Sequence, residues 1–478
     1  MMMSSTVIRL SKVLIGVGVG VLLLCVLAVS ATVTDRLLTL PLIEVGGLWL
    51  KAVTTIMNRT LAIFTTMPDW YSWTTYVYLL AAALICYGIY IVFFTPLNRI
   101  RKLCDVGYLT EGDLSKKEIA NNVMKRRMVG DIPPVYPNGW FGLIESFRLK
   151  RGEVKSIDLL GLNLAVFRDE KGEVHALDAY CPHMGANFAA GGRVIGDGIE
   201  CPFHAWRFRG EDGKCTHIPY CQKIPEIAKV KSWPILELNG WIYLWHHAEG
   251  IDPTWLPPEL EDIANGTWTY RGRTEHLVNS HIEEIPQNGA DVVHLAHVHG
   301  PLLGAGVDLR YMWSKVWGFG HHEWQAEWEP QSAPNEHIGV MRLGHSIQCF
   351  GNLFSIIGMN VTARQIGPGI VYMEFTSSFC KGVYIQSLTP VEPLLQKLVH
   401  NVYVHWTIPT FIGKFFLWGE AVQVERDIMI WNNKRYESKP LLVKSSEDSL
   451  TARHKRWFSQ FYSKNSKRFT FQRDKLDW

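Results

Sequence analysis

The sequence predicts an α+β protein with N-terminal transmembrane helices, a small all-β domain and a larger α+β domain. Three observations predict it: two long uncharged apolar runs near the N-terminus, a central stretch of short β-rich runs separated by glycine turns, and a C-terminal half with both helical and strand patterns. We place the membrane anchor at 1–98, a juxtamembrane linker at 99–137, the all-β domain at 138–250 and the α+β domain at 251–478.

Charge and cysteine usage exclude two broad classes of protein. The formal net charge is +3 and 19% of residues are charged, so nothing favours a nucleic-acid partner. The 9 cysteines form an odd count scattered over 478 residues, which is not the pattern of a secreted disulfide framework. A reducing compartment facing the cytosol fits best.

The anchor rests on two uncharged segments, residues 13–33 and 75–95. Each is long enough to cross a hydrocarbon layer of about 30 Å as a helix. Arg99, Arg101 and Lys102 follow the second segment, which by the positive-inside rule places the rest of the chain in the cytosol. We therefore expect a multi-pass or hairpin anchor, in the endoplasmic reticulum membrane, with cytosolic catalytic domains. A cleaved signal peptide for the first segment, and a buried core helix for either, are the alternatives.

Short β-rich runs occupy residues 139–249, with hairpin turns at "DEKGEV" and "LNGW". The proline-rich stretch 252–262 marks the next boundary. Beyond it we expect a helical stretch around 279–297, strands within 313–379 and helices to the end of the chain.

A metal centre is indicated by "CPHMGANFAAGGRVIGDGIECPFH", which opens at Cys181 and ends at His204. Zinc is the usual occupant of two cysteines and two histidines, but zinc fingers keep the two cysteines together and the two histidines together. Here each loop offers one of each, which suits a Rieske [2Fe–2S] cluster whose two irons have different ligands. Cys181 and Cys201 would bind one iron, and His183 and His204 the other.

The same stretch resembles the Rieske family at every ligand position. Rieske proteins of respiratory complexes carry an extra cysteine in each loop, where this chain has Ala186 and Phe203. The resemblance is therefore to the oxygenase type. One departure is Ala205, which stands where many Rieske oxygenases have glycine.

A second iron site is indicated by "EEIPQNGADVVHLAHVHG" at residues 283–300. Asp291 and His294 share one face of a helix. His299 would point away on an ideal helix, but Gly300 and the proline after it end the helix and let His299 turn back. Two imidazoles with one carboxylate form the facial triad of non-haem Fe(II) oxygenases. His297 remains an alternative to His299.

The third ligand is expected in "VQVERDIMIWNNKRY" at residues 422–436, which resembles the family stretch in which an Asp precedes an apolar-Trp-Asn-Lys run. Asp427 takes that position. Glu425 and Glu420 are the alternatives, although Glu425 lies on a different helix face from Asp427.

The resemblance to Rieske oxygenases carries further implications. Their Asp-x-x-His-x-x-x-x-His motif is matched by Asp291, His294 and His299. It implies a helix-grip catalytic domain, two histidine ligands to a mononuclear Fe(II), and a catalytic Asp291 that connects His294 to His204 of the next subunit in a head-to-tail homotrimer.

Longer pieces, including "DAYCPHMGAN", "GGRVIGDGIECPFHAW" and "FRGEDGKCTHIPYC", resemble the Neverland family of cholesterol 7-desaturases over about residues 130–478. This implies conversion of cholesterol to 7-dehydrocholesterol with O2, in steroid hormone synthesis, with electrons from NAD(P)H through a separate reductase. The alternatives are a Rieske monooxygenase that hydroxylates another sterol or hydrophobic substrate, and a membrane-anchored Rieske electron-transfer protein. Strands around 350–371 and 375–385 could line a sterol pocket, although core packing is the commoner role of such strands.

Overall fold

The computed structural model describes Lys51, Thr54 and residues 73–109, 112–126, 131–437 and 439–469. The chain divides into two compact units, Met1–Gly88 and Ile89–Trp478. The first predicted span, residues 13–33, lies outside the described residues.

The helix α3 (Trp73–Phe94) lies where the second span, residues 75–95, was predicted. It contains no charged residue, and large apolar side chains on it are exposed, including Leu80 and Ile85 at 62% each. Among the described helices, none was found that is long and apolar enough to cross a membrane.

The first residues of the predicted polar linker, 99–137, join the large sheet of the C-terminal domain. Strand β1 (Leu97–Arg101) pairs in parallel with β12 (Trp268–Val278), and helix α4 (Lys116–Arg126) follows. The guanidinium groups of Arg99 and Arg101 lie 2.8 and 3.0 Å from the Glu425 carboxylate. These charged residues suggested a solvated linker, but they have a buried partner far along the chain.

One eight-stranded sheet forms the frame of the C-terminal domain, in the order β1-β12-β18-β17-β16-β15-β14-β13. All pairs except β1–β12 are antiparallel. The strands after β12 are β13 (Gly320–Pro330), β14 (Ile338–Cys349), β15 (Asn352–Ile366), β16 (Ile370–Ser377), β17 (Lys381–Glu392) and β18 (Leu395–His405). The strands therefore continue well beyond residue 379, where the predicted strand region ended.

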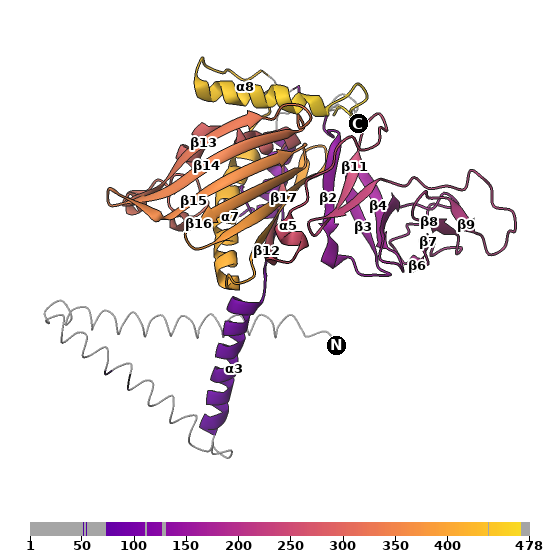
Figure 1. The fold of residues 1–478 in the computed structure, drawn as a ribbon, viewed down its shortest axis with the longest axis horizontal. Helices are drawn as coiled ribbons and strands as arrows, with labels where there is room; N and C mark the ends of the chain where they lie inside the picture. Colours follow the sequence, from indigo (N-terminus) through magenta and orange to yellow (C-terminus); the bar gives the residue numbers. More distant parts are fainter. Residues whose placement is uncertain are drawn as a thin grey trace. The chain divides into compact units, whose positions relative to one another are not determined.

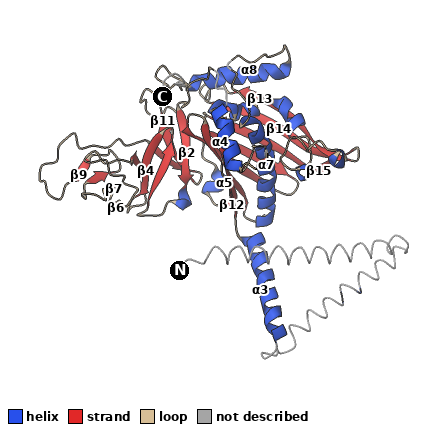
Figure 2. Cartoon of the chain, turned by 180° about the vertical axis from the view of Figure 1, so that it is seen from behind, coloured by secondary structure: helices blue, strands red, loops and turns tan. Residues whose placement is uncertain are grey.

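Two helices pack on this sheet. Helix α7 (Thr410–Trp431) crosses one face of it, as the view from behind in Figure 2 shows. It contacts β12 and β18. Helix α8 (Ser446–Phe458) lies along the β13 end of the sheet (Figure 1). The rings of Trp457 on α8 and Trp328 on β13 are 5.8 Å apart.

Three small antiparallel sheets build the N-terminal β domain, as the sequence predicted. They are β2 (Gly139–Glu145) with β10 (Ile235–Leu238) and β11 (Trp241–His246); β3 (Val154–Leu159), β4 (Leu162–Arg168) and β5 (Val174–Asp178); and β6 (Arg193–Ile195), β7 (Gly198–Glu200), β8 (Arg207–Arg209) and β9 (Cys215–His217). The predicted "LNGW" turn joins β10 to β11, and Asn239 and Gly240 there both have positive φ, as tight hairpin turns require.

The helical stretch predicted at 279–297 is broken into short pieces. These are the 3₁₀ turns η2 (Ile282–Glu284) and η3 (Pro286–Gly289), and helix α6 (Val292–Val298). Pro286 has no N–H to donate, and the Asp291 side chain caps a new helix start, so the chain cannot continue as one helix. Single 3₁₀ turns and a short helix complete the fold: η1 (Ser146–Arg148), α5 (Glu261–Ala264), η4 (Leu303–Ala305), η5 (Lys315–Trp317) and η6 (Ser459–Phe461).

A buried ion pair joins the β domain to the large sheet. Arg273 Nε of β12 lies 2.5 Å from the Glu145 carboxylate of β2, and the two side chains are 5% and 1% exposed. Arg148 also pairs with Glu145, at 3.1 Å, but is 40% exposed. Arg273 therefore supplies the buried countercharge that Glu145 needs.

We expect Arg273→Met to lower the free energy of unfolding by about 3–5 kcal/mol, because it leaves the Glu145 carboxylate buried without its main partner. Arg148→Met, the matched control on the same carboxylate, should cost less than about 1 kcal/mol. Denaturant titration of both variants measures the difference. Equal losses would contradict this assignment.

Candidate active site

The four sequence-predicted cluster ligands lie on two similar loops of the β domain. The carbonyl of Cys181 accepts from the Gly185 N–H at 2.9 Å, and the carbonyl of Cys201 accepts from the Ala205 N–H at 3.1 Å. Each loop thus makes the same tight turn directly after its cysteine. Gly185 and Ala205 both adopt positive φ, at 73° and 57°.

The cysteines and histidines of these loops differ in exposure. Cys181 and Cys201 are 2% and 3% exposed, whereas His183 is exposed and His204 half-buried. The rings of His183 and His204 are 4.7 Å apart, and His183 stacks on Trp206 at 4.6 Å. Two buried thiols behind two outward imidazoles suit a cluster that exchanges electrons at its histidine edge.

A second constellation forms on the helices that cover the large sheet. One ligand atom from each of His294, His299 and Asp427 lies within 4.8 Å of the others. His294 is on α6, His299 ends that helix, and Asp427 is on α7. Asp427 Oδ1 is buried without a hydrogen-bond partner. Two imidazoles, one carboxylate and an orphan carboxylate oxygen fit a non-haem Fe(II) ion.

Backbone and amide contacts fix which nitrogen each histidine offers. His294 Nδ1 contacts the Asp291 carbonyl, which only accepts, so Nδ1 carries the proton and Nε2 is free. His299 Nδ1 lies 2.9 Å from Gln423 Oε1, which also accepts from Arg426, so this Nδ1 is the donor as well. His299 Nε2 then faces Asp427 at 3.3 Å.

Burial lowers the pKa of His294, which keeps its imidazole neutral as a metal ligand requires. The Asp291 carboxylate accepts from the His294 backbone N–H at 3.4 Å and caps α6.

A buried arginine ties the histidine segment to α7. Arg426 is fully buried and donates to the carbonyls of Val298, Pro301, Leu302 and Gly306 at 2.9–3.2 Å. Burial lowers the pKa of Arg426 to about 10, so it stays charged at neutral pH. It therefore holds the loop after His299 against the helix turn that carries Asp427.

The alternatives that the sequence left open lie elsewhere. His297 is exposed, and its carbonyl accepts from Trp313. Glu425 is occupied by Arg99 and Arg101, and its oxygen lies 3.3 Å from His276 Nε2. Glu420 is 3.2 Å from His400 Nε2 and is not part of the constellation. Sequence reasoning missed Gln423 and Arg426, whose partners are remote in the chain.

A long apolar cavity of about 770 Å³ reaches the constellation. The predicted strand regions 350–371 and 375–385 contribute lining residues, among them Met359, Val361 and Tyr384, and α7 contributes one face. This volume lies within the range of clefts and cavities that bind small molecules.

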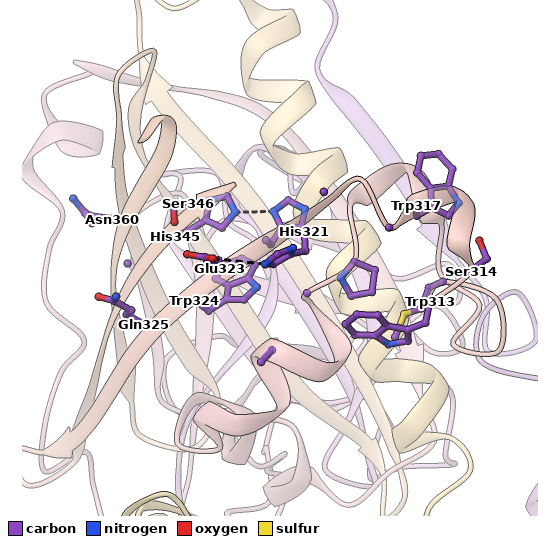
Figure 3. Close-up of a pocket in the computed structure, with 18 residues that line it drawn as sticks. Trp313, Ser314, Trp317, His321, Glu323, Trp324, Gln325, His345, Ser346 and Asn360 are labelled. Carbon is purple, nitrogen blue, oxygen red and sulfur yellow. Dashed lines mark hydrogen bonds and ion pairs between the residues drawn. The ribbon is translucent and has the colours of Figure 1, made fainter. Parts of the chain in front are cut away.

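A second cavity of about 700 Å³ adjoins the first and is drawn in Figure 3. His322, Trp324 and His345 line both cavities. His322 Nδ1 and His345 Nε2 are 2.7 Å apart. This pair forms part of the partition between the two spaces.

Comparisons with known proteins agree with this geometry. Residues 139–234 match the Rieske [2Fe-2S] domain, and residues 244–462 match the 3-ketosteroid 9alpha-hydroxylase C-terminal domain. The fold resembles the crystal structure of dicamba monooxygenase bound to 3,6-dichlorosalicylic acid, with a TM-score of 0.51 at 17% identity, over 69% of this chain and 98% of that one.

These matches define a Rieske oxygenase, in which a [2Fe–2S] domain is joined to a non-haem iron site. Two relatives narrow the class. The chain is 53% identical to cholesterol 7-desaturase nvd of Xenopus laevis, over 80% of this chain and 84% of the relative. It is 43% identical to cholesterol 7-desaturase nvd of Hemicentrotus pulcherrimus, over 97% of each. The chain belongs to the cholesterol 7-desaturase family, and the predicted resemblance is confirmed.

We expect Ala205→Gly to stabilise the β domain by about 1 kcal/mol, because glycine adopts the positive φ of this position without strain. Gly185→Ala is the matched control in the other loop. A Cβ there meets nothing within 4 Å, so backbone strain alone should cost a similar amount. Thermal unfolding of both variants tests this, and a destabilised Ala205→Gly would refute it.

We expect Gln423→Leu to weaken Fe(II) binding by about 10–100-fold, since it removes the acceptor that orients His299. Gln423→Glu keeps an acceptor at the same place and should retain most of the affinity. Competition with a chelator under anaerobic conditions measures both. Unchanged affinity in Gln423→Leu would show that His299 is oriented by other contacts.

Proposed function

We propose that this chain introduces the C7–C8 double bond of cholesterol and produces 7-dehydrocholesterol, using O2 and NAD(P)H-derived electrons from a separate reductase. The observation that carries the proposal is the identity of 43–53% to cholesterol 7-desaturases over most of the chain. An apolar cavity that reaches the second constellation suits a sterol.

In this proposal His294, His299 and Asp427 hold the mononuclear Fe(II), and Cys181, Cys201, His183 and His204 hold the [2Fe–2S] cluster. Together the two groups supply the activation of O2 that an unactivated C–H bond requires. Asp427 Oδ1, which has no hydrogen-bond partner, and the unprotonated Nε2 atoms of His294 and His299 support the first assignment. The buried thiols and outward imidazoles support the second.

The protein's own contribution is to position the sterol and to exclude water from it. The cavity walls are mostly apolar side chains of the sheet and of α7, so a bound sterol displaces water from them. The constellation lies at the wall of this cavity, so a sterol bound with its B ring at that wall would present C7 and C8 to it. A rigid sterol held in this way presents the same carbons in each turnover.

Asp291 has a further proposed role between subunits. It lies half-buried at the start of α6, beside His294, and His204 is also half-buried on the β domain. A carboxylate that links these two histidines across neighbouring subunits of a homotrimer would connect the cluster to the second iron.

We further propose that the enzyme works at a membrane, with its catalytic domains in the cytosol. Phe379, Phe411 and Phe415 line the cavity yet are 41–59% exposed, so this part of the cavity wall also presents an apolar surface to the outside. Phe411 contacts Phe93 near the end of α3, with ring centroids 5.2 Å apart. An apolar cavity wall that contacts Phe93, in the last turn of α3, suits a substrate that partitions into lipid.

A hydroxylase is the second candidate, because residues 244–462 match a domain described for a 3-ketosteroid 9alpha-hydroxylase. Both reactions begin by removing hydrogen from an unactivated carbon. The product distinguishes them.

We expect cells that express this chain with a competent reductase, and are fed labelled cholesterol, to accumulate labelled 7-dehydrocholesterol. His294→Ala should abolish the product, because it removes one of the three proposed iron ligands. Iron analysis of purified protein should show a fall from about three to about two irons per chain, with the cluster spectrum retained.

A hydroxylated sterol in place of the alkene would favour the second candidate. No product from a fully iron-loaded wild-type protein would contradict both sterol reactions. Glu327→Gln, on an exposed outward face of β13, serves as the unaffected control.

A further inference from the structure

An acidic side chain lies in the apolar cavity without belonging to the metal constellation. Glu420, Gln423 and Asp427 follow one another at i, i+3 and i+7 on α7, and all three line the cavity. Glu420 is therefore two helical turns from Asp427, about 10 Å along the helix axis. Its side chain is 15% exposed.

One carboxylate oxygen of Glu420 has a partner and the other does not. Oε1 lies 3.2 Å from Nε2 of His400, a fully buried residue of β18. That nitrogen also lies 2.8 Å from Gln386 Oε1 on β17. Glu420 Oε2 is buried and has no hydrogen-bond partner. A buried carboxyl oxygen is normally paired, so this atom points to a missing partner in the cavity.

Three other polar side chains of the cavity wall already have hydrogen-bond partners. Gln365 Oε1 lies 3.1 Å from His454 Nε2, Ser377 Oγ donates to the Cys380 carbonyl at 3.0 Å, and Gln386 is bound to His400. Apart from Asp427, the fully buried polar atoms without a hydrogen-bond partner among the described lining residues are Glu420 Oε2, His322 Nε2 and His345 Nδ1. The two histidines lie on β13 and β14, in the partition with the second cavity.

We propose that Glu420 binds the 3-hydroxyl group of the sterol substrate and so determines which carbon lies at the metal site. The proposal rests on the sterol desaturase function above. The hydroxyl is the one polar group of cholesterol, and burying it unpaired in an apolar cavity is unfavourable. Glu420 Oε2 is an unpaired partner in that cavity, and pairing the two satisfies both groups.

The spacing along α7 agrees with this orientation. C3 and C7 belong to the adjacent fused rings A and B, so with the hydroxyl at Glu420 ring B can lie at the Asp427 turn. Trp431, one turn beyond Asp427 on α7, also lines the cavity, so the D ring and the side chain have apolar lining to extend into. Burial also raises the pKa of Glu420 well above its usual range, and a neutral carboxyl can both donate to and accept from a hydroxyl.

The test compares cholesterol with cholest-5-ene, which lacks the hydroxyl, in wild type, Glu420→Leu and Glu420→Gln. In Glu420→Leu we expect KM for cholesterol to rise about ten-fold while KM and kcat for cholest-5-ene stay unchanged. The wild-type preference for cholesterol over cholest-5-ene should then fall close to one. Glu420→Gln still offers a donor and an acceptor, so it should keep most of the preference.

Iron content per chain is measured in each variant, and only fully loaded protein is compared, so a purely structural loss is separated from a recognition loss. A preference retained in Glu420→Leu would overturn the proposal. A preference that persists there and disappears in His345→Leu would assign the hydroxyl to the histidine pair instead. If wild type converts neither sterol, the proposed function fails; if it converts cholesterol and Glu420→Leu keeps the preference, only the role of Glu420 fails.

Discussion

The second site depends on the hydrogen bonds that the Arg426 guanidinium donates. It is fully buried on α7 and donates to four backbone carbonyls between Val298 and Gly306. Those carbonyls flank and follow His299, so one side chain on the Asp427 turn of α7 also holds the histidine segment. A buried charge is stable only when its donors are satisfied, and here the backbone of the ligand loop satisfies them.

Helix α7 gives three acidic residues three different environments. Glu425 faces β1 and β12, where two arginines compensate its charge and tie the segment after α3 to the sheet. Asp427 faces the two histidines with one oxygen unpaired. Glu420 faces the cavity beside a neutral histidine. All three side chains carry a carboxyl group, so the direction in which each one points and the residues around it decide what it does.

The two metal sites require opposite surroundings, and the two domains provide them. The β-domain loops leave their histidines accessible to solvent, which suits exchange of electrons with a partner. The sheet and α7 enclose an apolar cavity, which suits a water-poor reaction on a sterol. The buried pair of Glu145 and Arg273 joins the two domains that provide these environments.

The sequence alone determined the features that depend on local spacing. The Cys–His pairs, the glycine hairpins and the Asp-x-x-His-x-x-x-x-His motif lie within short stretches, and they identified the β domain, the class and the family. Only the tertiary structure decided that His299 and not His297 joins the constellation, that Glu425 is occupied by arginines, and that Gln423 and Arg426 support the site. It also turned part of a presumed linker into β1. Each of these outcomes depends on which remote segments become neighbours, and that is set by packing of the whole sheet and α7, which no local pattern encodes.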